Sequence, residues 1–246
     1  VVFLITDHGV SQARGKQFLY DEGTKIPFVV WAPKLFKPQT NQDLISHIDM
    51  SATSLQLAGI EIPDYMEARP LLGENYIPRE FIISARDRCD ETVDHIRSVR
   101  KGNFKYIKNY LPNRPYLQPC DYKDHKPWMS VLHQLDTEGK LTGAQQLVTA
   151  KTRPTEELYD LSVDPFEIHN LADNNAYASN LNELSGQLDK WIQETGDQGM
   201  IPESVKGYDS DMQAYLTPFR RRGKMKQVKN IEANIALMKY WAKEGK

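Results

Sequence analysis

The stretch VVFLITDHGV, residues 1–10, decides how the rest of the chain is interpreted. Its first six residues are apolar or β-branched and too few for a helix, so they predict a buried β-strand. This strand leads directly into Asp7, His8 and Gly9, of which the glycine allows the backbone to turn sharply. In open α/β sheets ligands bind beyond the carboxyl ends of the strands. A carboxylate beside an imidazole can bind a divalent cation there, and a turn capped by Asp7 is the alternative.

The next segments extend this strand into an α/β domain. The run PFVVWAP, residues 27–33, is continuously apolar, which is typical of a parallel sheet covered on both faces. The segment DMSATSLQLAGI, residues 49–60, has helical periodicity and is closed by Gly59. Strand, loop, strand and helix in this order predict an α/β fold. Because the first residue already lies inside a strand, we interpret the chain as the C-terminal part of a longer protein.

The pattern changes after about residue 78, where antiparallel strands and one amphipathic helix are expected. The predicted strands are 80–85, 95–102, 103–110 and 156–161. Apolar residues recur at spacings of three and four from Tyr177 to Trp191, which predicts a helix lying on this small sheet. A long insertion rich in Pro and Tyr, residues 111–154, is expected to be a functional or packed loop. We therefore expect boundaries that give residues 1–75, 76–199 and a tail, 200–246, that ends in a helix-like stretch.

The composition excludes several classes of protein. The 246 residues carry a formal net charge of -2, which argues against a nucleic-acid-binding protein. No apolar stretch approaches the about 20 residues that cross a bilayer, so we expect no membrane span. Two cysteines, Cys89 and Cys120, do not form a disulfide framework, and their pairing stays open.

A fixed spacing downstream of the first strand points to one family. Lys16 is followed by Tyr20, Gly23 and Pro27, the proline eleven residues after the lysine and directly before the second apolar run. Strand, Asp-His-Gly, loop, lysine, aromatic residue, glycine and proline in this order resemble the second signature region of the type I sulfatases. The resemblance implies an alkaline-phosphatase-like α/β/α sandwich, of which residues 1–75 are the C-terminal part. A small α+β lobe, with an antiparallel sheet and a packed helix, follows it.

The resemblance also implies the chemistry of the site. In that family the acid after the strand and its neighbour bind calcium, so Asp7 and His8 are the expected Ca²⁺ ligands. Lys16 matches the residue that binds the sulfate group and is the expected catalytic residue. A calcium ion and an ammonium group together neutralise a sulfate and the charge that develops on the leaving oxygen.

Later segments carry the same likeness. They are HIDMSATSLQLAGIEIP at 47–63, IRSVRKGNFKYIKN at 96–109 and ELYDLSVDPFEIHNLAD at 157–173. Within the family the closest likeness is to heparan N-sulfatases and related bacterial polysaccharide sulfatases. Those N-sulfatases have Asn after the metal-binding Asp and Arg at the position of Lys16, so the choice between N-sulfo and O-sulfo groups stays open. The family's nucleophile is a formylglycine made within Cys-x-Pro/Ala-Ser-Arg, which neither cysteine here matches, so this chain alone should be inactive.

The charged stretch SARDRCDETVDHIR, residues 84–97, supplies candidate substrate contacts. Arg86 suits a sulfate or carboxylate on an acidic sugar, and Asp87 suits its hydroxyl groups. His95 is a third candidate substrate contact. A solvated cluster of internal ion pairs is the alternative. The expected partners are a sulfated oligo- or polysaccharide and the missing N-terminal part of the same protein. The resemblance implies a periplasmic or extracellular location in a bacterium, or a lysosomal one in an animal.

Two other functions compete with the sulfatase prediction. A phosphodiesterase or phosphatase of the same superfamily would use Asp-His-Gly to bind one of two transition metals. Such a site needs a further downstream histidine, and the register of Lys16 and Pro27 favours the sulfatase. A non-catalytic glycan-binding relative is the third reading.

Overall fold

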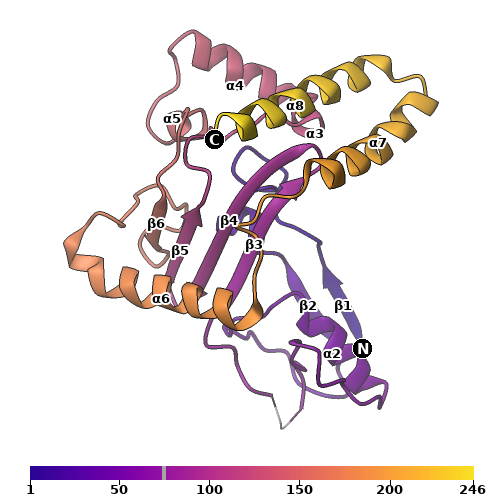
Figure 1. The fold of residues 1–246 in the computed structure, drawn as a ribbon. Helices are drawn as coiled ribbons and strands as arrows, with labels where there is room; N and C mark the ends of the chain where they lie inside the picture. Colours follow the sequence, from indigo (N-terminus) through magenta and orange to yellow (C-terminus); the bar gives the residue numbers. More distant parts are fainter. Residues whose placement is uncertain (74–75) are drawn as a thin grey trace.

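The central feature of the computed structural model, which describes residues 1–73 and 76–246, is a four-stranded antiparallel sheet (Figure 1). Its strands lie in the order β3 (Ile82–Cys89), β4 (Thr92–Lys101), β5 (Phe104–Asn109) and β6 (Glu156–Asp160). The sheet and the hairpin at Lys101-Gly102 are confirmed, and Gly102 adopts a φ of +55° that favours glycine. The expected boundary at residue 75 falls on residues 74–75, outside the described residues.

One face of this sheet is covered by helix α6 (Ala178–Thr195), as the apolar periodicity predicts. Leu184 and Leu188 of the helix pack on Val99, Tyr106 and Leu158 of the sheet, and all five side chains are buried. The 3₁₀ turn η1 (Asn175–Tyr177) leads into the helix. This apolar layer holds the sheet as a rigid platform.

The other face of the sheet is covered by a loop from the N-terminal region. Phe18, Leu19 and Tyr20 are buried against Ile96 and Ile107 of the sheet. The segment that carries Lys16 is therefore fixed to the C-terminal lobe by burial of aromatic and aliphatic surface.

The predicted parallel pairing of the first two strands is wrong. Strand β1 (Val2–Ile5) pairs antiparallel with β2 (Phe28–Trp31), with Val2 opposite Trp31. The connection between them folds back on itself, because the Gly9 and Val10 N–H groups donate to the Gly23 and Glu22 carbonyls. It therefore returns the chain beside β1 in the opposite direction instead of crossing over as a parallel connection would. Leu4 and Trp31 are 61% and 63% exposed, so one face of this pair is open. Helix α1 (Asp21–Thr24) is a short turn of helix in the connection between the two strands, and α2 (Asp49–Leu57) follows β2, as expected.

The insertion at residues 111–154 is helical in part, whereas the sequence predicted a loop. It contains α3 (Asp121–Asp124), α4 (Pro127–Thr137) and α5 (Ala144–Val148). Pro127 stands in the first turn of α4, where its missing N–H is harmless and its fixed φ favours the helix. Proline in this insertion thus starts a helix rather than marking a loop.

The expected tail is a helical hairpin that projects from the sheet (Figure 1). Helices α7 (Val205–Arg221) and α8 (Met225–Lys243) share an apolar seam that includes Met212, Leu216 and Ile231. Of the helices in the described ranges, none is both long and apolar enough to cross a membrane.

Candidate active site

Residues 7–24 form a compact loop whose two ends are hydrogen-bonded to each other. The Gly9 N–H donates to the Gly23 carbonyl at 2.9 Å, and the Val10 N–H donates to the Glu22 carbonyl at 3.0 Å. A Cβ at Gly9 would lie 1.9 Å from the Glu22 oxygen, and one at Gly15 would lie 1.9 Å from the Val10 oxygen. The bend at residues 7–9 is confirmed. Close backbone approach, which only glycine permits, is an additional reason for these glycines.

Asp7 and His8 stand side by side at the end of β1. The His8 Nδ1 lies 2.6 Å from the Gly9 carbonyl oxygen, which can only accept a hydrogen bond, so in the neutral imidazole the proton is on Nδ1. The lone pair is then on Nε2, 3.8 Å from an Asp7 carboxylate oxygen. The Asp7 side chain is 87% exposed and that of His8 is 30% exposed. Two electron-pair donors thus lie within 3.8 Å of each other on accessible side chains, which is compatible with a bound cation.

The donor chemistry of this pair fits calcium in part. Ca²⁺ takes six to eight ligands, mainly oxygens, and a carboxylate is its usual protein ligand. Asp7 matches that preference, whereas the imidazole nitrogen of His8 is a less typical calcium ligand. The pair can supply at most a minority of the ligands that the ion requires.

Lys16 is held next to the Asp7–Val10 segment. Its N–H donates to the Val10 carbonyl at 2.8 Å, and its ammonium lies 4.5 Å from the centroid of the Tyr122 ring. The Tyr122 hydroxyl in turn accepts a hydrogen bond from the Ser11 hydroxyl at 3.2 Å. A cation–π contact positions the ammonium without neutralising it, so Lys16 keeps its charge available for an anion.

The structure places the three candidate substrate contacts in different surroundings. Arg86 is buried, donates to the Gln17 carbonyl and lies 3.4 Å from Asp94, so its contacts support the Lys16 loop from within. Asp87 is about half exposed and accepts a hydrogen bond from Arg97 at 2.7 Å. His95 is buried, with Nδ1 3.4 Å from Asp87. Of the three, Asp87 alone presents an accessible side chain, and a substrate role for any of them stays a prediction.

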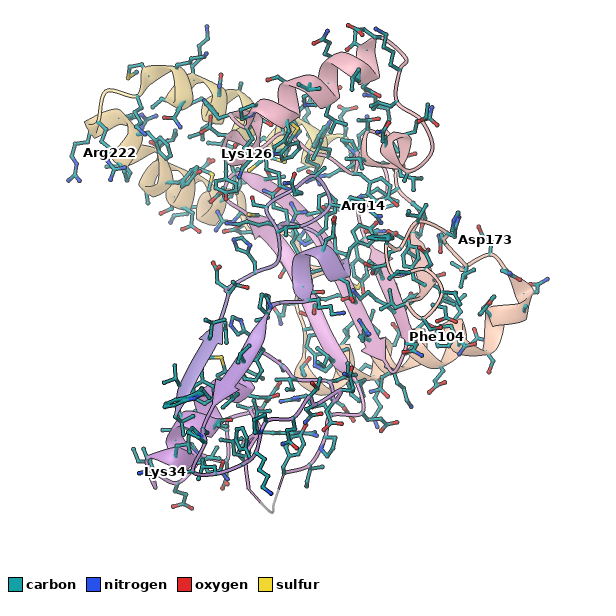
Figure 2. The ribbon with its side chains drawn as sticks, turned by 180° about the vertical axis from the view of Figure 1, so that it is seen from behind. Arg14, Lys34, Phe104, Lys126, Asp173 and Arg222 are labelled. Atoms are coloured by element: carbon teal, nitrogen blue, oxygen red, sulfur yellow. The ribbon has the colours of Figure 1, made fainter. Side chains whose placement is uncertain are left out.

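The late motif at 157–173 also contacts the loop of residues 7–24, in part through Arg14, which is labelled in Figure 2. Arg14 donates to the carbonyls of Phe166 and Glu167 at 2.8 and 2.7 Å. The Glu167 carboxylate accepts the Asp21 N–H at 2.6 Å and lies 3.1 Å from the buried Lys105 ammonium. The segment that carries this motif therefore also contacts the loop of the candidate site.

A buried ion cluster connects the sheet to the loop. Asp94 is fully buried on β4 and accepts two hydrogen bonds from Arg153, at 2.7 and 2.8 Å, and one from Gln118 at 2.9 Å. Burial alone would raise the pKa of Asp94, but the charges of Arg86 and Arg153 outweigh it and lower the pKa. Since Arg86 also binds the Gln17 carbonyl, this cluster fixes the position of the residue next to Lys16.

Lys123 is buried beneath the loop without a carboxylate at ion-pair distance among the described residues. Its ammonium lies 3.5 Å from the Ala13 carbonyl and 4.9 Å from the centroid of the Phe18 ring. Burial, with a smaller contribution from Arg86, lowers the pKa of Lys123 from 10.5 to about 8. A buried cation with so few partners costs stability at neutral pH.

Replacing Lys123 by methionine is therefore expected to stabilise the protein. At pH 7 the variant should gain about 1–3 kcal/mol in the free energy of unfolding, because the desolvation cost of the charge is removed. That cost is present below the folded pKa of about 8 and disappears as pH rises to 10.5, so the gain should shrink over this range. Urea unfolding between pH 7 and 10.5 measures it. Lys151→Met, at an 85% exposed side chain, is the control and should change little.

Several residues of the site lack a local sequence signal. Tyr122, Lys123 and Glu167 contact a loop more than 100 residues earlier in the chain. For Tyr122 and Lys123 the indication was the length of the insertion, which predicted that it packs on a neighbour, whereas Glu167 lies in the quoted motif at 157–173.

The comparisons with known proteins agree with the geometry. The family model described as Sulfatase matches residues 1–60. An "Ulvan-active sulfatase" of Formosa agariphila is 38% identical over 206 residues, covering 83% of this chain and 35% of the relative. The human "N-sulphoglucosamine sulphohydrolase" is 28% identical, covering 80% of this chain and 42% of the relative. The predicted family resemblance is confirmed.

A solved structure described as a "2-O GAG sulfatase" shares the fold. Its TM-score is 0.56 at 21% sequence identity, over 82% of this chain and 38% of that chain. The α/β fold class with its antiparallel lobe is therefore confirmed. The chain spans between a third and a half of the length of these relatives.

Proposed function

The chain belongs to the sulfatase family, and we propose that it forms the C-terminal part of an enzyme that removes sulfate groups from a sulfated polysaccharide. The observation that carries this proposal is the loop of residues 7–24, which brings a carboxylate, an imidazole and an ammonium onto one short segment. Among the described residues, no carboxylate lies within ion-pair distance of that ammonium. An anionic substituent that meets a bound cation and an ammonium at once is the ligand this arrangement suits.

Each residue of the loop has a distinct role in the proposed reaction. Asp7 and His8 would bind one Ca²⁺, which when present supplies charge stabilisation for the sulfate oxygens. Lys16 would bind a sulfate oxygen through its ammonium and stabilise the negative charge that develops as the sugar leaves. Tyr122 keeps that ammonium in place, and the apolar packing of Phe18 and Tyr20 fixes the loop on the sheet.

We propose that the remaining groups come from a part of the protein outside this chain. That part would supply the formylglycine nucleophile and the other calcium ligands, so the chain alone would not turn over its substrate. This division agrees with the donor count, because Asp7 and His8 fill only part of a calcium coordination sphere.

The substrate class follows from the relatives. Two ulvan-active sulfatases, 38% and 29% identical, support a sulfated polysaccharide as the substrate. N-sulphoglucosamine sulphohydrolase, 28% identical, supports a sulfated amino sugar instead. A polysaccharide cannot diffuse into the cytoplasm, so we place the enzyme in the periplasm or outside the cell.

Sulfate release by the complete protein tests this proposal. Ulvan, an N-sulfated glucosamine and a phosphate monoester are incubated with it, with Ca²⁺ and after chelation. We expect sulfate release that requires Ca²⁺, from ulvan or from the N-sulfated sugar. Phosphate release without sulfate release would establish the phosphatase alternative, and no release from any of the three would support a glycan-binding relative.

A further inference from the structure

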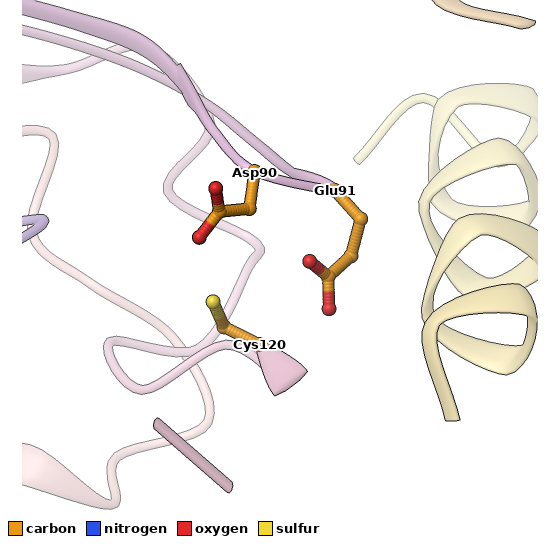
Figure 3. A group of neighbouring side chains, drawn as sticks. All are labelled: Asp90, Glu91 and Cys120. Carbon is orange, nitrogen blue, oxygen red and sulfur yellow. The ribbon is translucent and has the colours of Figure 1, made fainter. Parts of the chain in front are cut away.

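Three side chains from two distant segments converge beside the loop of residues 7–24, and none of them is among the residues proposed to bind calcium or sulfate (Figure 3). Asp90 and Glu91 form the turn between β3 and β4, and Cys120 directly precedes α3 in the insertion. One potential ligand atom from each residue lies within 4.8 Å of the other two. Glu91 and Cys120 are fully buried, and Asp90 is partly exposed.

The Glu91 carboxylate is oriented toward this cluster. Its Oε1 accepts hydrogen bonds from the Asp121 N–H at 2.7 Å and from the Asn234 amide on α8 at 2.8 Å. Its Oε2 is buried and accepts none from the described residues. Figure 3 shows one carboxylate oxygen on the side of Asp90 and Cys120. A buried carboxylate oxygen without a partner is costly, so this one marks a position where a ligand would be stabilising.

The donor set identifies the kind of ligand. Two carboxylates and a thiol near one point repel one another when ionised, and a divalent cation offsets this charge. A cysteine thiolate favours zinc and other borderline or soft transition metals over Ca²⁺ and Mg²⁺. The Gln17 amide, 3.0 Å from the Cys120 sulfur, donates to it and would support the thiolate form.

We propose that Asp90, Glu91 and Cys120 bind a zinc-class divalent transition metal, with water as the remaining ligand. Hydrogen bonds from Asp121, Asn234 and Gln17 orient the ligands from outside the coordination sphere. The partly exposed Asp90 provides the route of entry. The ion would join the β3–β4 turn to the insertion, and through Gln17 it would brace the segment next to Lys16. This site is separate from the calcium site proposed at Asp7 and His8.

Co²⁺ is the probe that tests this site, because a thiolate bound to Co²⁺ gives a near-ultraviolet charge-transfer band. The reduced protein is titrated with Co²⁺ and then with Zn²⁺, in the presence of excess Ca²⁺. We expect one equivalent of Co²⁺ to produce the band, Zn²⁺ to abolish it and Ca²⁺ to leave it unchanged. Zn²⁺ should also raise the melting temperature of the wild-type protein.

The two cysteines supply a matched pair of variants. Cys120→Ser should lose the band, whereas Cys89→Ser, one residue before the turn, should keep it. Glu91→Gln should weaken Co²⁺ binding by about 10–100-fold while circular dichroism shows a folded protein. If Cys120→Ser fails to fold, Asp90→Asn at the partly exposed position should weaken Co²⁺ binding, because it removes a carboxylate ligand while the Cys120 thiolate still gives the band. A folded wild-type protein without the band, or a band that survives in Cys120→Ser, would overturn the assignment.

Discussion

Replacing Lys16 by alanine in the complete enzyme is expected to lower kcat by two or more orders of magnitude. The ammonium contacts charge that develops in the transition state, and removing one such contact costs about 10²–10³ in rate. Because the contact strengthens as the reaction proceeds, kcat should fall by a larger factor than KM rises. Steady-state kinetics of sulfate release from a soluble sulfated oligosaccharide, with Ca²⁺ at saturation, measures both constants.

Two variants separate this role from a structural one. Lys25→Ala removes an exposed lysine that directly follows the loop of residues 7–24. This variant should keep kcat within about twofold of the wild-type value, as surface substitutions usually do. Lys16→Arg keeps the charge and should recover part of the lost rate, since arginine also binds oxyanions. Near-normal kcat in Lys16→Ala would show that Lys16 is a surface lysine held by Tyr122. The Lys16 role would then have to be withdrawn.

Local patterns account for most of the elements that the sequence predicted. Strands β3 to β6 carry β-branched and aromatic residues between turn residues, and α6 carries an apolar stripe, so each is readable within a short window. The relative direction of two strands cannot be read in this way, because the apolar sequences of β1 and β2 are compatible with either parallel or antiparallel pairing. The helices of the insertion were missed because proline and tyrosine suggested a loop, although Pro127 begins α4. In the tail, the final helix-like stretch corresponds to α8, whereas α7 was missed because its charged residues obscure a narrow apolar seam.

The candidate site likewise contains some residues that a local sequence pattern predicts and others that only the complete fold brings together. Asp7, His8 and Lys16 were identified from the order and spacing of one segment, and the structure holds that segment together by its glycines. Their surroundings come from elsewhere in the chain: Tyr122 lies 111 residues after Ser11, which it contacts. Arg86 lies 69 residues after Gln17. Contacts at such separations depend on the whole fold, and no local periodicity encodes them.

Removing the Asp94 carboxylate is expected to destabilise the protein by about 3–5 kcal/mol, the usual cost of leaving a buried ion without its partner. In Asp94→Ala the buried guanidinium groups of Arg86 and Arg153 lose the only carboxylate that the described residues place within ion-pair distance of them. Gln118 also loses its acceptor. Urea unfolding at pH 7, followed by circular dichroism, measures the loss. Because Arg86 anchors the Gln17 carbonyl, the complete enzyme should also lose activity in this variant.

An ion pair on the surface shows how much of the stability cost expected for Asp94→Ala is due to burial. Asp209 and Lys239 form an ion pair between α7 and α8, with side chains 44% and 43% exposed. Asp209→Ala should cost less than about 1 kcal/mol, because water screens the exposed charges. The difference in the free energy of unfolding between the wild-type protein and Asp94→Ala should also decrease at acid pH, because the pKa of Asp94 is lowered in the folded state. Its contribution to stability is complete above the ordinary pKa of 3.8 and is lost as pH falls through the folded pKa. Equal costs for the two variants at pH 7 would mean that the cluster at Asp94 adds no more than a solvated pair and does not fix the Lys16 loop.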